Sequence, residues 1–195
     1  TDYLPNYPVY KGREYKKITK TNLENAIAKN FNQLKSQHIS DYQKYFNRVS
    51  LQLTGTGQAD DMSTDERLKK IKDTKNENYL TQLYFQYGRY LLIASSRENT
   101  LPANLQGIWA NKIQTPWNGY YHTNINIQMN YWLAETCNLA ELHQPFFDLI
   151  RMYQPSGKDL ARRMGMKGWA MAHSTDVWGS ARSMGIQPMW AATYL

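Results

Sequence analysis

The residues best suited to chemistry lie between His122 and Gln128, where polar and apolar side chains alternate. In an extended chain this alternation places His122, Asn124, Asn126 and Gln128 on one side and Thr123, Ile125, Ile127 and Met129 on the other, because successive side chains point in opposite directions. On a helix the two asparagines lie about 200° apart and cannot converge, so we expect an extended segment that becomes helical near Ile127. An imidazole and two amides can bind a neutral polar ligand. The alternative is that the amides bond the backbone of their own loop, as asparagines commonly do, and the spacing leaves both readings open.

A second cluster, within residues 168–179, combines an imidazole, a carboxylate and an indole in His173, Asp176 and Trp178. His173 and Asp176 could form a metal pair, but two ligands are too few for a site and nothing nearby completes a set. We therefore expect no metal and no cofactor. A histidine held by a neighbouring carboxylate, with tryptophan rings as walls, is better suited to sugar recognition. A buried His–Asp pair with a purely structural role is the alternative.

Carboxyl groups are scarce beyond residue 100. Glycoside hydrolysis typically needs two of them, one on each side of the bond that breaks. Glu135 and Glu141 are candidates, but they fall on different helix faces, and charges on helix surfaces are usually just solvated. The sequence therefore shows no evident catalytic pair of carboxylates.

Composition and charge limit the partners of the chain. Of the net charge of +7, +5 falls on residues 1–75, where acidic residues are interspersed among the basic ones. A solvated surface explains this pattern better than a nucleic-acid interface, so we expect no nucleic-acid partner. All six tryptophans lie between Trp109 and Trp190, where charge is sparse, which indicates a concave site for an uncharged polar ligand. No apolar run approaches the roughly 18 residues of a membrane span, so we expect no membrane partner.

Hydrophobic periodicity predicts a mainly α-helical chain. The expected helices cover the ranges 22–45, 63–72, 78–96, 127–139, 142–164 and 183–195. Thr21 is the predicted N-cap of the first helix. Pro155 and its neighbours should break the fifth helix in two. Gly88 lowers the helix propensity of the third, which we explain by close packing against a neighbouring element.

The other segments are expected to be extended or irregular. Residues 49–53 alternate like a short strand, and residues 1–12 are typical of a last strand or an extended tail. The long loop from Arg97 to Asn124 is far too apolar to be disordered. We expect it to be ordered and functional, because long ordered loops in compact domains usually are.

Several motifs together resemble those of glycoside hydrolase family 95, the inverting α-L-fucosidases and their α-L-galactosidase relatives. The resemblance is carried by the segments 87–97, 101–109, 116–117, 121–132 and 168–178. These motifs cover residues 84–179 densely, and their combination is specific.

This resemblance implies the N-terminal part of an (α/α)6 barrel, preceded by a helical and extended linker. Residues 76–195 correspond to the first helices of the catalytic domain, which is truncated here. Residues 13–75 correspond to the linker, and residues 1–12 to the end of a preceding β-sandwich domain. A barrel cut after its first helices exposes apolar faces. We therefore expect either association between copies or a longer parent chain.

The resemblance also implies roles for single residues. Asn124 and Asn126 match asparagines that orient the attacking water, and His122 matches a position that contacts fucose. Further substrate-binding residues are expected in the matching motifs, at Trp117, His173, Asp176 and Trp178. In the family an aspartate activates the water and a glutamate protonates the leaving oxygen, and both lie beyond residue 195.

The function implied is exo-acting hydrolysis of terminal fucose from glycans with inversion at the anomeric carbon. The substrate is then a fucosylated oligosaccharide, and the compartment is periplasmic or extracellular, as is usual in the family. We expect the 195 residues alone to be inactive. The alternatives are a non-catalytic carbohydrate-binding fragment and an α-L-galactosidase of the same family.

Overall fold

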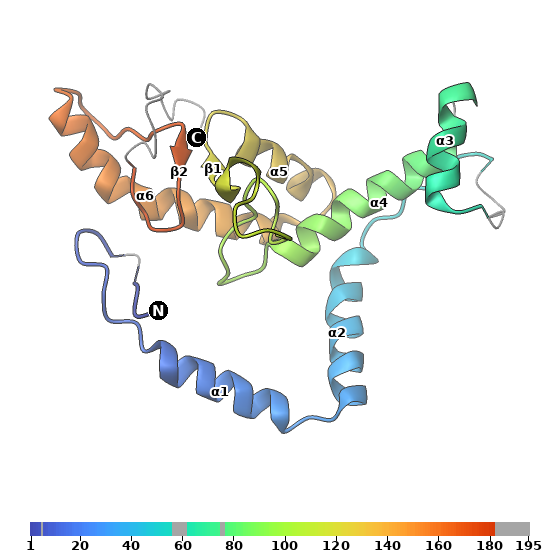
Figure 1. The fold of residues 1–195 in the computed structure, drawn as a ribbon, viewed down its shortest axis with the longest axis horizontal. Helices are drawn as coiled ribbons and strands as arrows, with labels where there is room; N and C mark the ends of the chain where they lie inside the picture. Colours follow the sequence, from blue (N-terminus) through green and yellow to red (C-terminus); the bar gives the residue numbers. More distant parts are fainter. Residues whose placement is uncertain (5, 56–61, 75–76, 182–195) are drawn as a thin grey trace.

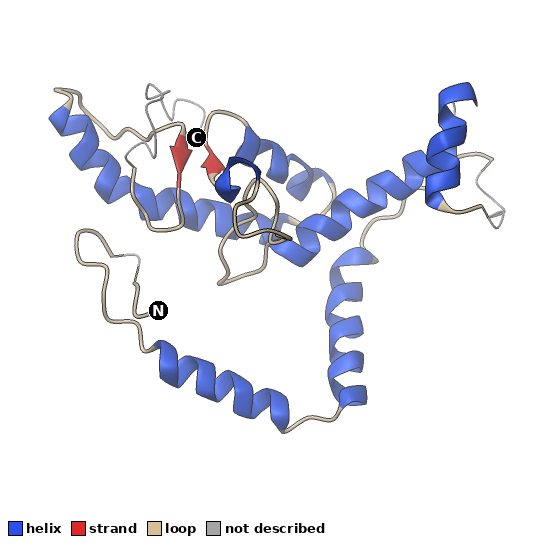
Figure 2. Cartoon of the chain, viewed as in Figure 1, coloured by secondary structure: helices blue, strands red, loops and turns tan. Residues whose placement is uncertain are grey.

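The structure, a computed structural model, describes residues 1–195 except 5, 56–61, 75–76 and 182–195. It is mainly helical, as predicted (Figures 1 and 2). Within the described residues the α-helices are α1 (Tyr15–Ile27), α2 (Phe31–Phe46), α3 (Thr64–Thr74), α4 (Asn78–Ser95), α5 (Asn126–Thr136) and α6 (Gln144–Arg163). The shorter elements are two 3-10 helices and two strands, η1 (Pro116–Gly119), η2 (Ala140–His143), β1 (Tyr121–His122) and β2 (Ser174–Thr175). The helix expected over 183–195 lies outside the described residues.

Helices α4, α5 and α6 form the body of the molecule, and α1 and α2 leave it as an arm (Figure 1). The main core lies where these three helices meet η2 and β1, and it includes Leu92, Ile93, Ile127, Leu142, Leu149 and Tyr153. No residue of α1 or α2 is buried. None of the described helices is both long and apolar enough to cross a membrane.

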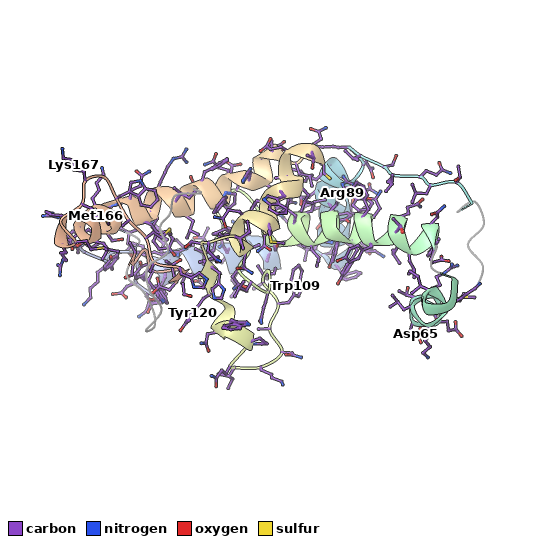
Figure 3. The ribbon with its side chains drawn as sticks, turned by 90° about the horizontal axis from the view of Figure 1, so that it is seen from above. Asp65, Arg89, Trp109, Tyr120, Met166 and Lys167 are labelled. Atoms are coloured by element: carbon purple, nitrogen blue, oxygen red, sulfur yellow. The ribbon has the colours of Figure 1, made fainter. Side chains whose placement is uncertain are left out.

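Tyr131 of α5 ties the long loop to this core through its hydroxyl group. The hydroxyl lies 2.8 Å from Oγ of Ser96 and accepts a hydrogen bond from the backbone N–H of Ala103. The ring is buried and stacks on His143 and Phe146. The first part of the loop that we predicted to be ordered is therefore anchored by side-chain hydrogen bonds. Figure 3 shows the part of the loop between Trp109 and Tyr120 projecting from the layer of helices.

Arg89 of α4 joins the arm to the body (Figure 3). Its guanidinium is fully buried and donates hydrogen bonds to the carbonyl oxygens of Val49 at 2.6 Å, Phe46 at 2.9 Å and Tyr45 at 3.2 Å. It also donates to the Gln86 side chain at 2.7 Å. The last carbonyls of a helix lack partners within the helix and carry partial negative charge, so a buried cation at the end of α2 satisfies both needs.

The single helix expected over 22–45 is two helices. Asn30 begins α2 with a capping box, in which its side chain accepts from the N–H of Gln33 while the Gln33 side chain accepts from the N–H of Asn30. Thr21 lies inside α1, so its predicted role as N-cap is wrong. The apolar residues on either side of the break are solvent-exposed, Ile27 by 72% and Phe31 by 75%. With no core to favour a continuous helix, the cap determines where α2 begins.

The strand expected at residues 49–53 is absent from the described structure. Arg89 takes the carbonyl of Val49, and the N–H of Leu53 donates to the Gln82 side chain. Both groups thus bond side chains of α4 and not a neighbouring strand. Residues 1–4 and 6–12 contain no helix or strand, and the N–H of Gly12 donates to the carbonyl of Asp2, so this segment folds back on itself.

Helix α6 continues through Pro155, so the predicted break is wrong. The two residues after the proline are held from outside the helix. The Ser156 hydroxyl donates to the carbonyl of Gly179 at 2.7 Å. A Cβ on Gly157 would lie 2.7 Å from the carbonyl oxygen of Ala170, so the segment after α6 packs directly on the helix here. These tertiary contacts outweigh the bond that the proline removes.

Two other expectations concern α4. The helix itself is confirmed, but a Cβ on Gly88 would meet no described atom within 4 Å, so the packing explanation is wrong. The apolar faces that we expected to be exposed are present. A groove of about 620 Å³ between α3 and α4 is lined by Leu68, Leu80 and Tyr84, and Tyr84 is 80% exposed.

Replacing Arg89 by methionine tests its role at the junction. The variant leaves the carbonyls of Phe46 and Val49 without their side-chain donor, so we expect the free energy of unfolding to fall by about 2–4 kcal/mol in urea denaturation. Arg151→Met is the matched control, because Arg151 pairs with Asp148 on the surface, and we expect a change below about 0.5 kcal/mol. Equal effects of the two substitutions would contradict the role given to Arg89.

Candidate active site

The two clusters that we singled out in the sequence lie together in the structure. β1 pairs with β2 in antiparallel fashion, with Tyr121 opposite Thr175 and His122 opposite Ser174 (Figure 1). The next residue, Thr123, extends the contact. Its N–H donates to the carbonyl of His173 and its hydroxyl to the carbonyl of Ala172, each at 2.8 Å. Segments about fifty residues apart thereby form one site.

Three predicted site residues form an aromatic cluster on this pairing. The rings of His122 and His173 have centroids 4.7 Å apart, and the Trp117 ring meets His122 edge-on at 5.8 Å. His122 is buried, whereas the Trp117 side chain is 71% exposed. Trp117 also has a φ of 54°, a left-handed conformation that is rare for a bulky residue. Such strained residues gather at functional sites, where the surrounding structure holds them in place.

Asn124 and Asn126 follow this cluster directly, but the segment is not extended as far as we predicted. The extended part ends at β1, residues 123–125 form a turn, and α5 already begins at Asn126. The prediction that the chain is extended as far as Ile127 is therefore wrong, and the two amides do not share a strand face. Asn124 is exposed and Asn126 half-buried.

The alternative was that the two asparagine side chains bond the local backbone, but other residues make those bonds. Among the described residues, neither the Asn124 nor the Asn126 side chain has a hydrogen-bond partner. Gln128 instead donates from Nε2 to the carbonyl of Thr123 at 2.7 Å, and Asn130 donates to the carbonyl of Asn104 at 3.0 Å. The two predicted site amides thus remain available to a ligand.

Asp176 and Trp178 do not join the histidines in the expected way. The Asp176 carboxylate accepts a hydrogen bond from the N–H of Trp178 at 2.8 Å, while Nδ1 of His173 lies 3.1 Å from the Ser174 hydroxyl. The Trp178 ring packs edge-on against Tyr3, with centroids 4.5 Å apart. A hydroxyl therefore takes the place of the predicted carboxylate beside His173, and Trp178 lines a separate cavity of about 240 Å³ near the N-terminal segment.

The two glutamates considered as catalytic groups have structural partners. Glu141 receives a bidentate bond from Arg48, at 2.8 and 2.9 Å, and this hydrogen bonding lowers the pKa of Glu141 to about 2. A general acid needs the opposite shift. Glu135 lies 3.0 Å from Nδ1 of His143. Nowhere among the described residues do three or more His, Cys, Asp or Glu side chains gather as metal ligands.

Sequence reasoning missed two residues that shape the site, Thr123 and Gln128. Thr123 was placed on the face opposite the asparagines, and Gln128 was grouped with them as a ligand-facing residue. Thr123 bonds partners 49 and 50 positions away, which no local spacing reveals. The bond of Gln128 spans five residues across a turn that we had expected to be extended.

The sequence model of the glycosyl hydrolase family 95 catalytic domain matches residues 30–195. The chain belongs to this family. It is 42% identical over 166 residues to alpha-L-fucosidase 2 of Arabidopsis thaliana, a match that covers 83% of this chain and 20% of that protein. It is 36% identical over 174 residues to the probable alpha-fucosidase A of Aspergillus niger, covering 87% and 22%. The corresponding protein of Aspergillus oryzae is 33% identical over 192 residues, covering 96% and 26%.

This family 95 chain thus spans between about a fifth and a quarter of the length of these curated relatives. The matched region contains the whole β1–β2 pairing, the aromatic cluster and both asparagines. The site described above therefore lies within the catalytic domain of the family.

The buried His122 makes the stability of the site depend on pH. Burial, and to a lesser extent the neighbouring His173, lower the pKa of His122 below its ordinary value of 6.5. Between the two values only the unfolded chain binds the proton, so stability is fully present above pH 6.5 and falls as the pH drops toward the folded-state pKa. The slope from this one group is at most about 1.4 kcal/mol per pH unit.

We expect His122→Gln to remove this dependence. Urea denaturation of both proteins between pH 7.5 and 5 should show a shallower loss of stability in the variant. An NMR titration of the His122 imidazole gives the direct value, and a midpoint above 6.5 would contradict the burial argument.

Proposed function

We propose that this chain is part of an exo-acting, inverting α-L-fucosidase, and that Asn124 and Asn126 position the water that attacks the terminal fucose. One observation carries the proposal. Both amides are free of partners among the described residues, beside a cluster of two histidines and an exposed tryptophan. Membership of family 95 and three relatives with fucosidase names support the reaction class.

The aromatic cluster suits the sugar. The exposed face of Trp117 offers an apolar surface to the C–H groups and the methyl group of fucose. His122, whose lowered pKa keeps it neutral near pH 7, can donate one hydrogen bond and accept another from the sugar hydroxyls. A neutral ring beside a second histidine avoids a buried charge that an uncharged sugar could not offset.

The asparagine side chains are suited to orienting the attacking water. An amide carbonyl is too weak a base to remove a proton, but it can accept a hydrogen bond from a water molecule and so direct the water oxygen toward the anomeric carbon. Proton removal then needs a carboxylate, and departure of the aglycone needs a general acid on the opposite face of the sugar. Glu135 and Glu141 fit neither task, because each is engaged with a basic partner. We place both carboxyl groups in the part of the longer enzyme beyond residue 195.

The proposed substrate is a glycan with a terminal α-linked fucose, met outside the cytoplasm. Fucose and galactose of the L series differ at C6, where fucose carries a methyl group and galactose a hydroxymethyl group. Comparing nitrophenyl α-L-fucoside with nitrophenyl α-L-galactoside therefore separates the two family activities. Binding of fucose without hydrolysis of either substrate would favour the non-catalytic alternative.

Alanine substitutions test the water-positioning role in the full-length enzyme. We expect Asn124→Ala and Asn126→Ala each to lower kcat for the fucoside by about 10²–10³-fold, because the water loses its orientation, while KM changes little. Asn111→Ala is the control, since Asn111 is exposed on the same loop and lies outside the cluster. Rates near those of the unmodified enzyme in both variants would rule the role out.

A further inference from the structure

Gln128 bridges the turn from which Asn124 projects. Its Nε2 donates to the carbonyl of Thr123 at 2.7 Å, so a side chain in the first turns of α5 is bonded to the first residue of the turn. Thr123 is in turn fixed to the segment that carries His173, through its N–H and its hydroxyl. One chain of hydrogen bonds therefore links the histidine cluster, the turn and the start of α5.

Besides the Gln128 bond, a backbone hydrogen bond joins the turn to α5, from the N–H of Met129 to the carbonyl of Ile125 at 2.9 Å. Ile125, the N-cap residue of α5, makes no side-chain capping bond and has a φ of −164° and a ψ of −31°. Its side chain is 42% exposed, so packing constrains it only partly. The positions of Asn124 and Asn126 consequently depend on how the two ends of the turn are joined, and Gln128 joins them.

The other end of the Gln128 side chain shows that stability is not its main contribution. Its Oε1 is buried without a hydrogen-bond partner among the described residues. A buried acceptor left unpaired costs at least as much as one hydrogen bond contributes, so the net contribution of the Gln128 side chain to stability is small. Polar groups whose cost to stability is tolerated in this way are typical of functional sites.

We propose that Gln128 is a positioning residue of the hydrolytic reaction, which fixes the Asn124–Asn126 amide pair relative to His122 by bonding the Thr123 carbonyl. This inference rests on the proposed function. A shift of about 1 Å in a catalytic group can lower a rate by as much as about 10²-fold even when the substrate still binds. The loss should therefore fall on kcat and not on KM.

Gln128→Met in the full-length enzyme removes the donor and keeps the shape. We expect kcat for nitrophenyl α-L-fucoside to fall about 10–100-fold with KM within about 3-fold. The melting temperature should fall by no more than about 3–6 °C, because removal of the unpaired oxygen partly offsets the loss of the donor to the Thr123 carbonyl. Asn130→Leu is the matched control. Asn130 also donates from α5 to a loop carbonyl, but that of Asn104, so we expect kcat within about 3-fold of the unmodified enzyme.

The pH dependence of kcat in Gln128→Glu distinguishes a positioning role from a purely structural one. An ionised carboxylate cannot donate to the Thr123 carbonyl, whereas a protonated one can. Relative to the unmodified enzyme at each pH, the kcat of this variant should be low at pH 7.5 and should recover at least about 5-fold as the pH falls to 5. This test decides the matter if the Met variant does not fold.

Three outcomes overturn the inference. They are a kcat for Gln128→Met within 2-fold of the unmodified enzyme, a loss matched by Asn130→Leu, or a flat pH profile of relative activity for Gln128→Glu. If Asn124→Ala and Asn126→Ala are inactive while Gln128→Met is not, this inference alone fails. If the asparagine variants remain active as well, the proposed function fails with it.

Discussion

The site depends on a short backbone pairing between strands about fifty residues apart. β1 and β2 contain only two residues each, and a ladder of this length is weak by itself. Thr123 strengthens it with two further hydrogen bonds to the opposite segment, one from the backbone and one from a buried hydroxyl. The His122–His173 pair takes its position from this junction.

Buried polar side chains perform the same task elsewhere in the molecule. Arg89 donates to carbonyl groups at and just beyond the end of α2, and the Tyr131 hydroxyl joins α4, α5 and the long loop. Each of these groups bonds backbone atoms at or beyond the end of a helix, where partners within the helix are missing. These side-chain bonds, rather than further strands, attach the long loop and the exposed arm to the body of the molecule.

Local patterns in the sequence predicted those parts of the fold that depend on local interactions. The apolar rhythm of residues 78–96 identified α4, and the aromatic content of the long loop indicated that it is ordered. The failures have a tertiary cause. Pro155 does not break α6, because the segment that follows the helix holds Ser156 and Gly157. Periodicity predicted one helix over α1 and α2, but the apolar residues beside the break are exposed and form no core that would favour a continuous helix. The sequence motifs identified His122 and His173 separately, but only long-range pairing brings them together.

The central claim is that the Asn124 and Asn126 amides face a water molecule at the anomeric carbon of a fucose bound on His122 and Trp117. A crystal structure of the full-length enzyme with a bound fucose analogue tests it most directly. We expect one ordered water within about 3.2 Å of both amide oxygens, on the face of the sugar opposite the leaving oxygen. A sugar bound away from the His122–His173 pair, or amides that point away from its anomeric carbon, would contradict the account.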